Sequence, residues 1–176
     1  SSDLSSSRAL RGVTEQYGGD YYAAAVGEVN VTTKMKECGC LIGGEGNGGV
    51  IYPALHYGRD AMVGVALFLT NLAYKNIKVS ELLATYPKYV IAKNKIELSD
   101  SALIDRILEE VKSVYASEDI NTIDGVKISF EDRKEWVHLR RSNTEPIIRI
   151  YAEAATKEAA DALAQQIIDI AESIIK

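Results

Sequence analysis

The spacing of apolar and polar residues divides the chain into two halves with different patterns. In the first half, helical segments alternate with short apolar runs, and the elements expected there are helices over 8–17, 29–37 and 61–74 and strands over 38–42 and 50–52. Asp60 stands where the helix over 61–74 needs a cap. That helix is apolar almost all round, so it is expected to be buried. The alternation predicts a partial α/β domain with a mixed sheet.

After Pro87 the pattern changes to strands joined by short polar turns. The expected elements are strands over 89–98, 126–130, 136–140 and 147–153, and helices over 102–115 and from 157 onward. Ser99 or Asp100 is expected to cap the first helix, and Thr156 the second. This order predicts an α+β domain, an antiparallel four-stranded sheet with helices on one face. The two domains are expected to span 1–87 and 88–176.

Charge and cysteine content narrow the classes of partner. The 176 residues carry a formal net charge of -5, so no overall field attracts nucleic acid or anionic lipid. No apolar run is long enough to span a bilayer, and the N-terminal residues do not resemble a signal peptide. Cys38 and Cys40 are too few to make a zinc site and are expected to be free thiols in a reducing cytosol. We therefore expect a cytoplasmic protein without a metal ligand set.

A cluster of hydrogen-bond donors lies in the turn between the last two expected strands. The candidate phosphate ligands in this turn are Arg140, Ser142, Asn143 and Thr144, with Arg149 in a supporting place on the next strand. Guanidinium forks match phosphate oxygens two at a time, and hydroxyl and amide groups add further donors. A solvated hairpin with ordinary surface charges would have the same residue types. The turn is thus a candidate phosphate-binding loop.

The direction of each side chain in this turn follows from strand geometry. Arg140 and Arg141 must point to opposite faces of their strand, so one is expected to aim at the ligand and the other at solvent. Glu145 would repel a phosphate and is expected to pair with an arginine, which would hold the shape of the loop.

A second candidate site is the glycine-rich segment 43–49. It matches neither nucleotide-binding pattern, and the carboxylate of Glu45 would repel phosphate. Glu45 can accept from adjacent sugar hydroxyls, and Asn47 can both donate and accept. The alternative interpretation is a tight turn with an incidental carboxylate. His56 follows shortly and could face the same ligand, although a single histidine usually has no catalytic role.

The segment Arg140-Arg141-Ser142-Asn143-Thr144-Glu145-Pro146, with the later Arg149 and Tyr151, resembles the phosphate-binding loop of the alpha-D-phosphohexomutases. The family pattern is Arg, any residue, Ser, Gly or Asn, Thr, Glu, Pro, and every element is present. The resemblance implies that Arg140, Ser142, Asn143 and Thr144 hold the phosphate of the substrate. It also implies that this half is the fourth and last domain of the family.

The glycine-rich segment resembles the sugar-recognition loop of the family's third domain, Gly-Glu-x-Ser-Gly-His. The aligned residues run from Gly44 to Gly49, with Asn47 in place of the serine and Gly49 in place of the histidine. Glu45 carries over as a sugar ligand, whereas the two departures leave the remaining sugar contacts open. This segment, Gly-Glu-Gly-Asn-Gly-Gly, together with the Val-Ile-Tyr-Pro that follows it, is most similar to the phosphoglucosamine mutases of the family.

Two motifs of the family are absent from this sequence. They are the serine motif that carries the phosphoryl group and the Asp-rich loop that holds magnesium in the preceding domains. The resemblance therefore implies the C-terminal portion of an enzyme that interconverts hexose 6-phosphate and hexose 1-phosphate, with Mg²⁺ and the N-terminal domains elsewhere. This portion alone is expected to be inactive. A phosphomannomutase/phosphoglucomutase and a non-catalytic phosphosugar-binding module stay as alternatives.

Overall fold

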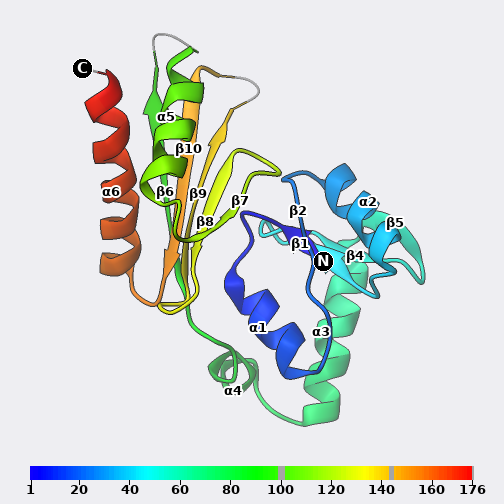
Figure 1. Ribbon diagram of the computed structural model, residues 1–176. Helices are drawn as coiled ribbons and strands as arrows, with labels where there is room; N and C mark the ends of the chain where they lie inside the picture. The colour runs from blue at the N-terminus through cyan, green and yellow to red at the C-terminus, as the bar shows by residue number, and fades with distance from the viewer. Residues whose placement is uncertain (99–101, 143–144, 176) are drawn as a thin grey trace. The chain divides into compact units, whose positions relative to one another are not determined.

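The structure, a computed structural model, describes residues 1–98, 102–142 and 145–175 (Figure 1). The chain divides into two compact units, Ser1–Lys88 and Tyr89–Lys176, which are described separately. The expected caps of the helix that begins at Ala102, Ser99 and Asp100, lie outside the described residues.

Unit 1 is a mixed sheet with helices. Its elements are β1 (Ser2–Asp3), α1 (Arg8–Gln16), β2 (Ala23–Ala24), α2 (Glu28–Cys38), β3 (Gly43–Gly44), β4 (Val50–Tyr52), β5 (His56–Arg59), α3 (Ala61–Lys75) and α4 (Val79–Ala84). The strand order is β2-β1-β3-β4-β5. The strands β2 and β3 run parallel to β1, whereas β4 is antiparallel to both of its neighbours. The expected α/β class with a mixed sheet is therefore confirmed.

The strand expected over 38–42 is wrong. The helix α2 continues through Cys38 and ends at Gly39, which adopts a left-handed φ of 62° that suits glycine. The N–H of Cys40 then donates to the carbonyl of Met35 at 2.9 Å and completes the helix end. The strand begins later, at Gly43. The C-terminal end of α2, and not a strand, therefore occupies residues 38–40. Both cysteines are free thiols.

The helix α3 begins as expected but is not buried. Asp60 caps it, because its Oδ1 accepts from the N–H of Val63 at 3.0 Å. No residue of α3 is buried, and Met62 and Tyr74 are 77% and 88% exposed. The helix packs on the sheet along one side only, where a Cβ on Gly64 would lie 3.1 Å from Val50. The other apolar sides have no cover within unit 1.

Unit 2 is an antiparallel sheet in the order β6-β10-β9-β8-β7. Its elements are β6 (Val90–Glu97), α5 (Ala102–Val114), β7 (Asp119–Asn121), β8 (Val126–Phe130), β9 (Glu135–Arg141), β10 (Ile147–Ala154) and α6 (Lys157–Ile175). Both helices lie on one face of the sheet (Figure 1). The expected α+β class is confirmed, and the short edge strand β7 adds a fifth strand that the sequence pattern did not reveal.

Alternate residues of the central strands form the core of unit 2. Leu139, Ile148 and Ile150 are fully buried and pack with Ile107 of α5 and Ile167 of α6. The cap of α6 is the expected one, since the N–H of Ala159 donates to Thr156 Oγ1 at 3.2 Å. Because side chains alternate along a strand, the residues between these core positions project from the opposite face of the sheet, which carries no helix.

We expect Gly125→Ala to destabilise unit 2 by about 2 kcal/mol or more, because φ is 75° and a Cβ would lie 2.9 Å from the Cα of Arg140. Chemical denaturation followed by fluorescence of Trp136, the single tryptophan, measures this change. Lys134→Gly is the control, since Lys134 has a φ of 56° and glycine adopts that conformation readily. A Gly125→Ala variant as stable as the unaltered chain would contradict the expectation.

Candidate functional site

Three cations lie side by side on the helix-free face of unit 2. Arg140 of β9 is directly opposite Arg149 of β10, and Arg149 is directly opposite Lys95 of β6. Like charges at directly opposite positions are destabilising. Lys95 has a partner, because its Nζ lies 2.8 Å from Glu97 Oε1. Arg140 has Asp124 as its carboxylate partner, so the three cations still exceed these two carboxylates by one positive charge, which favours an anion beside the loop after β9.

The guanidinium group of Arg140 is largely withdrawn from solvent. Its side chain is 15% exposed, and Nη1 lies 3.5 Å from Asp124 Oδ2. Its Nε is buried and has no hydrogen-bond partner among the residues that the structure describes. A buried donor without an acceptor costs roughly 1–3 kcal/mol, and more when it is charged. An anionic ligand at this position would supply the acceptor.

His138 holds the turn that carries Asp124. Its Nε2 donates to the carbonyl oxygen of Asp124 at 2.6 Å, and the residue is 1% exposed. Burial is the main cause that lowers the pKa of His138 to about 4; the hydrogen bond to Asp124 opposes it, and the nearby charges of Lys127 and Arg140 act in the same direction as burial. His138 is thus neutral at physiological pH and adds no charge to the site.

The two arginines at the end of β9 point to opposite faces, as expected. Arg141 Nη2 lies 3.9 Å from Asp105 Oδ2 of α5, on the helix-covered side. The arginine beside the candidate ligand is therefore Arg140. Ser142 is 6% exposed, and its N–H donates to the carbonyl of Ile147 at 3.0 Å, which closes the base of the loop. The expected contacts of Asn143 and Thr144 lie outside the described residues.

Glu145 does not have the partner that the sequence suggested. It is exposed, and no ion pair joins it to an arginine within the described part of the chain. It acts instead on Lys95: the pKa of Lys95 is raised mainly by its hydrogen bond and charge interaction with Glu97, with a smaller contribution from the charge of Glu145. Within the described residues, the charge of Glu145 thus has a small effect on Lys95, and Glu145 forms no salt bridge with an arginine.

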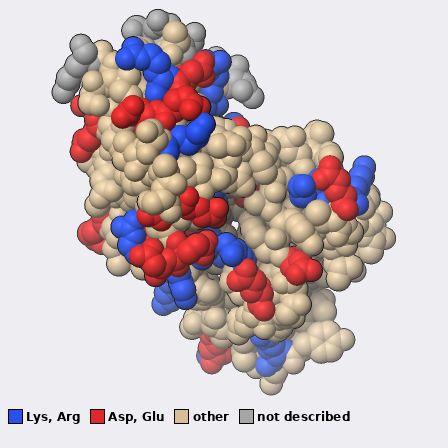
Figure 2. Space-filling view, viewed as in Figure 1, with Lys and Arg blue, Asp and Glu red and all other residues tan. Residues whose placement is uncertain are grey.

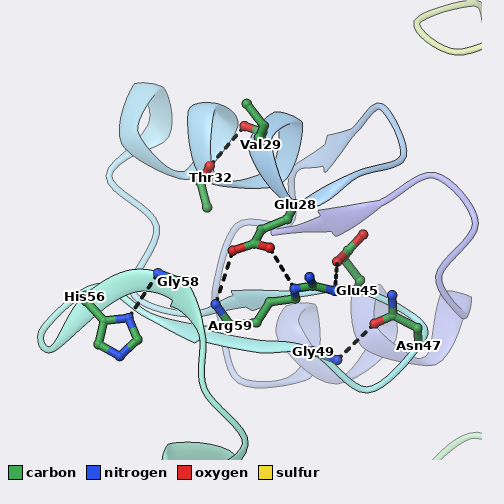
Figure 3. Close-up of polar contacts among 9 residues, drawn as sticks. All are labelled: Glu28, Val29, Thr32, Glu45, Asn47, Gly49, His56, Gly58 and Arg59. Carbon is green, nitrogen blue, oxygen red and sulfur yellow. Dashed lines mark hydrogen bonds and ion pairs between the residues drawn. The ribbon is translucent and has the colours of Figure 1, made fainter.

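The glycine-rich segment of unit 1 forms a tight turn between β3 and β4. The N–H of Glu45 donates to the carbonyl of Gly49, and the N–H of Gly48 to the carbonyl of Glu45, both at 3.0 Å. The N–H of Gly49 donates to Asn47 Oδ1 at 3.1 Å (Figure 3). The side-chain carbonyl of Asn47 thus serves the turn itself, and its amide NH₂ is the group left to meet a ligand.

Figure 3 shows that Glu45 belongs to a three-residue ionic group. The Glu45 side chain is 6% exposed, and its Oε2 lies 3.5 Å from Arg59 Nη1. Arg59 Nε lies 2.7 Å from Glu28 Oε2, and the Arg59 N–H donates to Glu28 Oε1 at 3.3 Å. Glu28 and Arg59 line an open hollow of about 570 Å³ together with Asn47 and Asp60. No role was expected for either of them from the sequence.

His56 lies on β5, beside this group. Its Nδ1 accepts from the N–H of Gly58 at 3.0 Å, so Nε2 is the protonated nitrogen that donates to Asp60 Oδ2, also at 3.0 Å. The pKa of Asp60 is lowered first by the N–H of Val63 and then by His56. Both ring nitrogens are therefore engaged at the start of α3.

Charge and metal-ligand content outside these two sites are unremarkable. Acidic and basic side chains are interspersed on the face that Figure 2 shows, with no continuous field of one sign. Within the described ranges, no three His, Cys, Asp or Glu side chains lie close enough together to hold a metal ion. In the same ranges no helix is both long and apolar enough to cross a membrane. The local row of cations is therefore the candidate site for an anion.

Comparison with known protein families shows first the class of protein that the chain matches and then the family to which it belongs. The two units match successive domains of sugar-phosphate mutases: an alpha/beta/alpha domain III over residues 1–89 and a C-terminal domain over residues 89–170. The chain belongs to the phosphoglucomutase/phosphomannomutase family. The resemblance seen in the two loops is thus confirmed at the level of the family.

Several curated relatives share this region. The chain is 38% identical over 149 residues to the phosphoglucosamine/phosphogalactosamine mutase of Sulfurisphaera tokodaii, a match that covers 84% of this chain and 32% of that protein. It is 34% identical to a probable phosphoglucosamine mutase of Methanopyrus kandleri, with 96% and 37% covered. It is 35% identical to a phosphoglucomutase/phosphomannomutase of Thermococcus kodakarensis, with 98% and 38% covered. The chain therefore spans about a third of the length of these relatives.

Solved structures confirm the fold. A phosphoglucomutase/phosphomannomutase family protein of Burkholderia thailandensis superposes with a TM-score of 0.77 at 23% identity, with 98% of this chain and 37% of that chain covered. The N-acetylphosphoglucosamine mutase of Aspergillus fumigatus, in complex with GlcNAc-6P and magnesium, superposes with a TM-score of 0.63 at 17% identity. That match covers 92% of this chain and 38% of the other.

We expect the stability of unit 2 to decrease as the pH decreases, because the pKa of His138 is lowered in the folded state. Its pKa is about 4 when folded and 6.5 in the reference state, so the unfolded chain takes up the proton first. The contribution is complete above pH 6.5 and is lost as the pH falls toward 4, by about 3 kcal/mol in total. Denaturation at pH 7 and pH 4, followed by Trp136 fluorescence, measures it.

His138→Gln is the control for this effect, because the amide can still donate to Asp124 but does not titrate. Carboxylates titrate equally in both proteins, so the difference between the two pH profiles isolates the histidine. Identical profiles would contradict the assignment.

Proposed function

We propose that this chain is the substrate-binding C-terminal portion of a phosphohexomutase that interconverts hexose 6-phosphate and hexose 1-phosphate, with a hexosamine phosphate as the preferred substrate. The observation that carries the proposal is the buried, unsatisfied Nε of Arg140 beside Arg149. Family membership supports the reaction class. The whole-protein activity is part of the proposal, since the chain covers about a third of its relatives.

In this proposal, unit 2 holds the phosphate group. Arg140 donates from Nε and from its terminal nitrogens to the phosphate oxygens, and Arg149 adds a second positive charge from the adjacent strand. Ser142, Asn143 and Thr144 are the further donors that the family resemblance implies. Such a clamp contributes positioning and charge stabilisation to phosphoryl transfer without itself reacting.

Unit 1 reads the sugar in this proposal. Glu45 accepts from sugar hydroxyls, and the NH₂ group of Asn47 donates. Glu28 and Asp60 line the hollow with Arg59 as its cation, and Glu45 contacts the same arginine, so carboxylates outnumber cations around Arg59. A surplus carboxylate suits a sugar that carries an ammonium group, and relatives named phosphoglucosamine mutase support the same choice. Because the Thermococcus kodakarensis relative is named a phosphoglucomutase/phosphomannomutase, mannose phosphate and glucose phosphate are the second candidate substrates.

The transfer step is assigned to the rest of the protein. Neither a phosphorylatable serine motif nor an Asp-rich metal loop of the family pattern occurs in this sequence. When bound, magnesium would supply charge neutralisation at the transferring phosphoryl group. The residues described here bind and orient the substrate, and no step of the transfer is routed through them.

Arg140→Ala should weaken the binding of glucosamine 6-phosphate by about 10-fold or more, because one charge-assisted donor group is worth roughly 1.5–3 kcal/mol. Isothermal titration calorimetry on the chain measures the affinity. Arg141→Ala is the matched control, since it removes the same charge from the opposite face of the same strand. Equal losses in the two variants would show that the effect is a general one of net charge.

The chain alone should show no conversion of glucosamine 6-phosphate to the 1-phosphate, because it holds the substrate without a group to transfer the phosphoryl. A coupled assay with a full-length relative as the positive control measures this. Turnover by the chain alone would contradict the assignment of the transfer step to the rest of the protein.

A further inference from the structure

Arg59 has contacts that suggest more than a surface ion pair. It is the last residue of β5, and it bridges two carboxylates that lie on separate elements: Glu28 at the start of α2 and Glu45 in the turn after β3 (Figure 3). The Glu45 side chain is 6% exposed, whereas the Arg59 side chain is 50% exposed. A buried carboxylate needs a hydrogen-bonded or charged partner to stay ionised. In the described part of the chain, Arg59 is the cation that meets Glu45.

Glu28 fixes the position of Arg59 from two sides. One carboxylate oxygen lies 2.7 Å from the side-chain Nε, and the other accepts from the backbone N–H of the same arginine at 3.3 Å. A single carboxylate thus contacts both the backbone and the guanidinium group of Arg59. The guanidinium group has little freedom left, and Nη1 is presented toward Glu45.

Gly49 gives a second, independent indication. A Cβ at this position would lie 2.7 Å from Arg59 Cδ and 3.1 Å from Cγ. Gly49 is not among the glycines with positive φ, so its backbone does not require glycine. The space for a side chain at position 49 is instead filled by the stem of Arg59. The loop pattern that this segment resembles has histidine there.

We propose that Arg59 is the positioning residue for Glu45 and occupies the place of a side chain at position 49. The proposal rests on the proposed function, in which Glu45 contacts the sugar. The cation of this loop comes from β5, is anchored by Glu28, and holds the Glu45 carboxylate in place for the sugar hydroxyls. Arg59 acts through Glu45 and is not itself placed on the phosphate.

The test compares two ligands by calorimetry on the unaltered chain, Arg59→Ala and Arg59→Lys. Glucosamine 6-phosphate should bind about 10-fold more weakly to Arg59→Ala and regain part of that loss in Arg59→Lys, which restores the charge. Inorganic phosphate, which engages only the clamp of unit 2, should bind all three equally. Arg11→Ala is the control, because Arg11 pairs with Glu15 on the surface of α1.

Unchanged affinity of Arg59→Ala for the sugar phosphate would overturn the positioning role. So would an equal loss for both ligands, or an Arg59→Lys variant no better than Arg59→Ala. If the unaltered chain binds inorganic phosphate but not glucosamine 6-phosphate, the proposed function fails, and this inference fails with it. A failure of Arg59 alone leaves the effect of Arg140→Ala intact, so the two failures are distinguishable.

A double-mutant cycle tests the role of position 49. Gly49→Ala should also weaken binding of the sugar phosphate, because the new Cβ displaces the stem of Arg59. In the Arg59→Ala background the same substitution has space, so it should cost nothing further, and the two effects should be non-additive. Additive losses would show that Gly49 serves another purpose and would overturn this part of the proposal.

Discussion

The pairing register of β9 and β10 is the constraint on which the candidate phosphate site depends. It sets Arg140 opposite Arg149 and, one strand further, Arg149 opposite Lys95. The same register buries Leu139, Ile148 and Ile150 under the helices. A slip by one residue would exchange the two faces, expose these core residues and bury the arginines. The packing energy of the core therefore holds together a row of cations that would otherwise repel one another.

The two candidate sites have local charge surpluses of opposite sign. In unit 2, cations outnumber their local partners, and the buried Nε of Arg140 lacks an acceptor among the described residues. In unit 1, two carboxylates share Arg59, and the surplus is negative. This division is consistent with the net charge of -5, because neither site relies on a field of the whole molecule.

Local rules predicted the parts of the structure that are local. The caps Asp60 and Thr156 and the opposite directions of Arg140 and Arg141 follow from neighbours a few residues away. Tertiary contacts decided the rest. The ion pair of Glu28 with Arg59 joins residues 31 positions apart, which one sequence cannot reveal. The prediction that α3 is buried was wrong, because an apolar helix is buried only where another element covers it.

The two departures from the family's sugar loop are linked in space. A Cβ on Gly49 would lie 3.4 Å from Asn47 Oδ1 as well as 2.7 Å from Arg59 Cδ. Asn47 closes the turn through the N–H of Gly49, and Arg59 fills the volume beside it. A side chain at position 49 would therefore displace the stem of Arg59, whereas it would only touch the side chain of Asn47. The asparagine holds the turn and the arginine fills the space at the glycine, so the two departures belong to one arrangement beside Glu45.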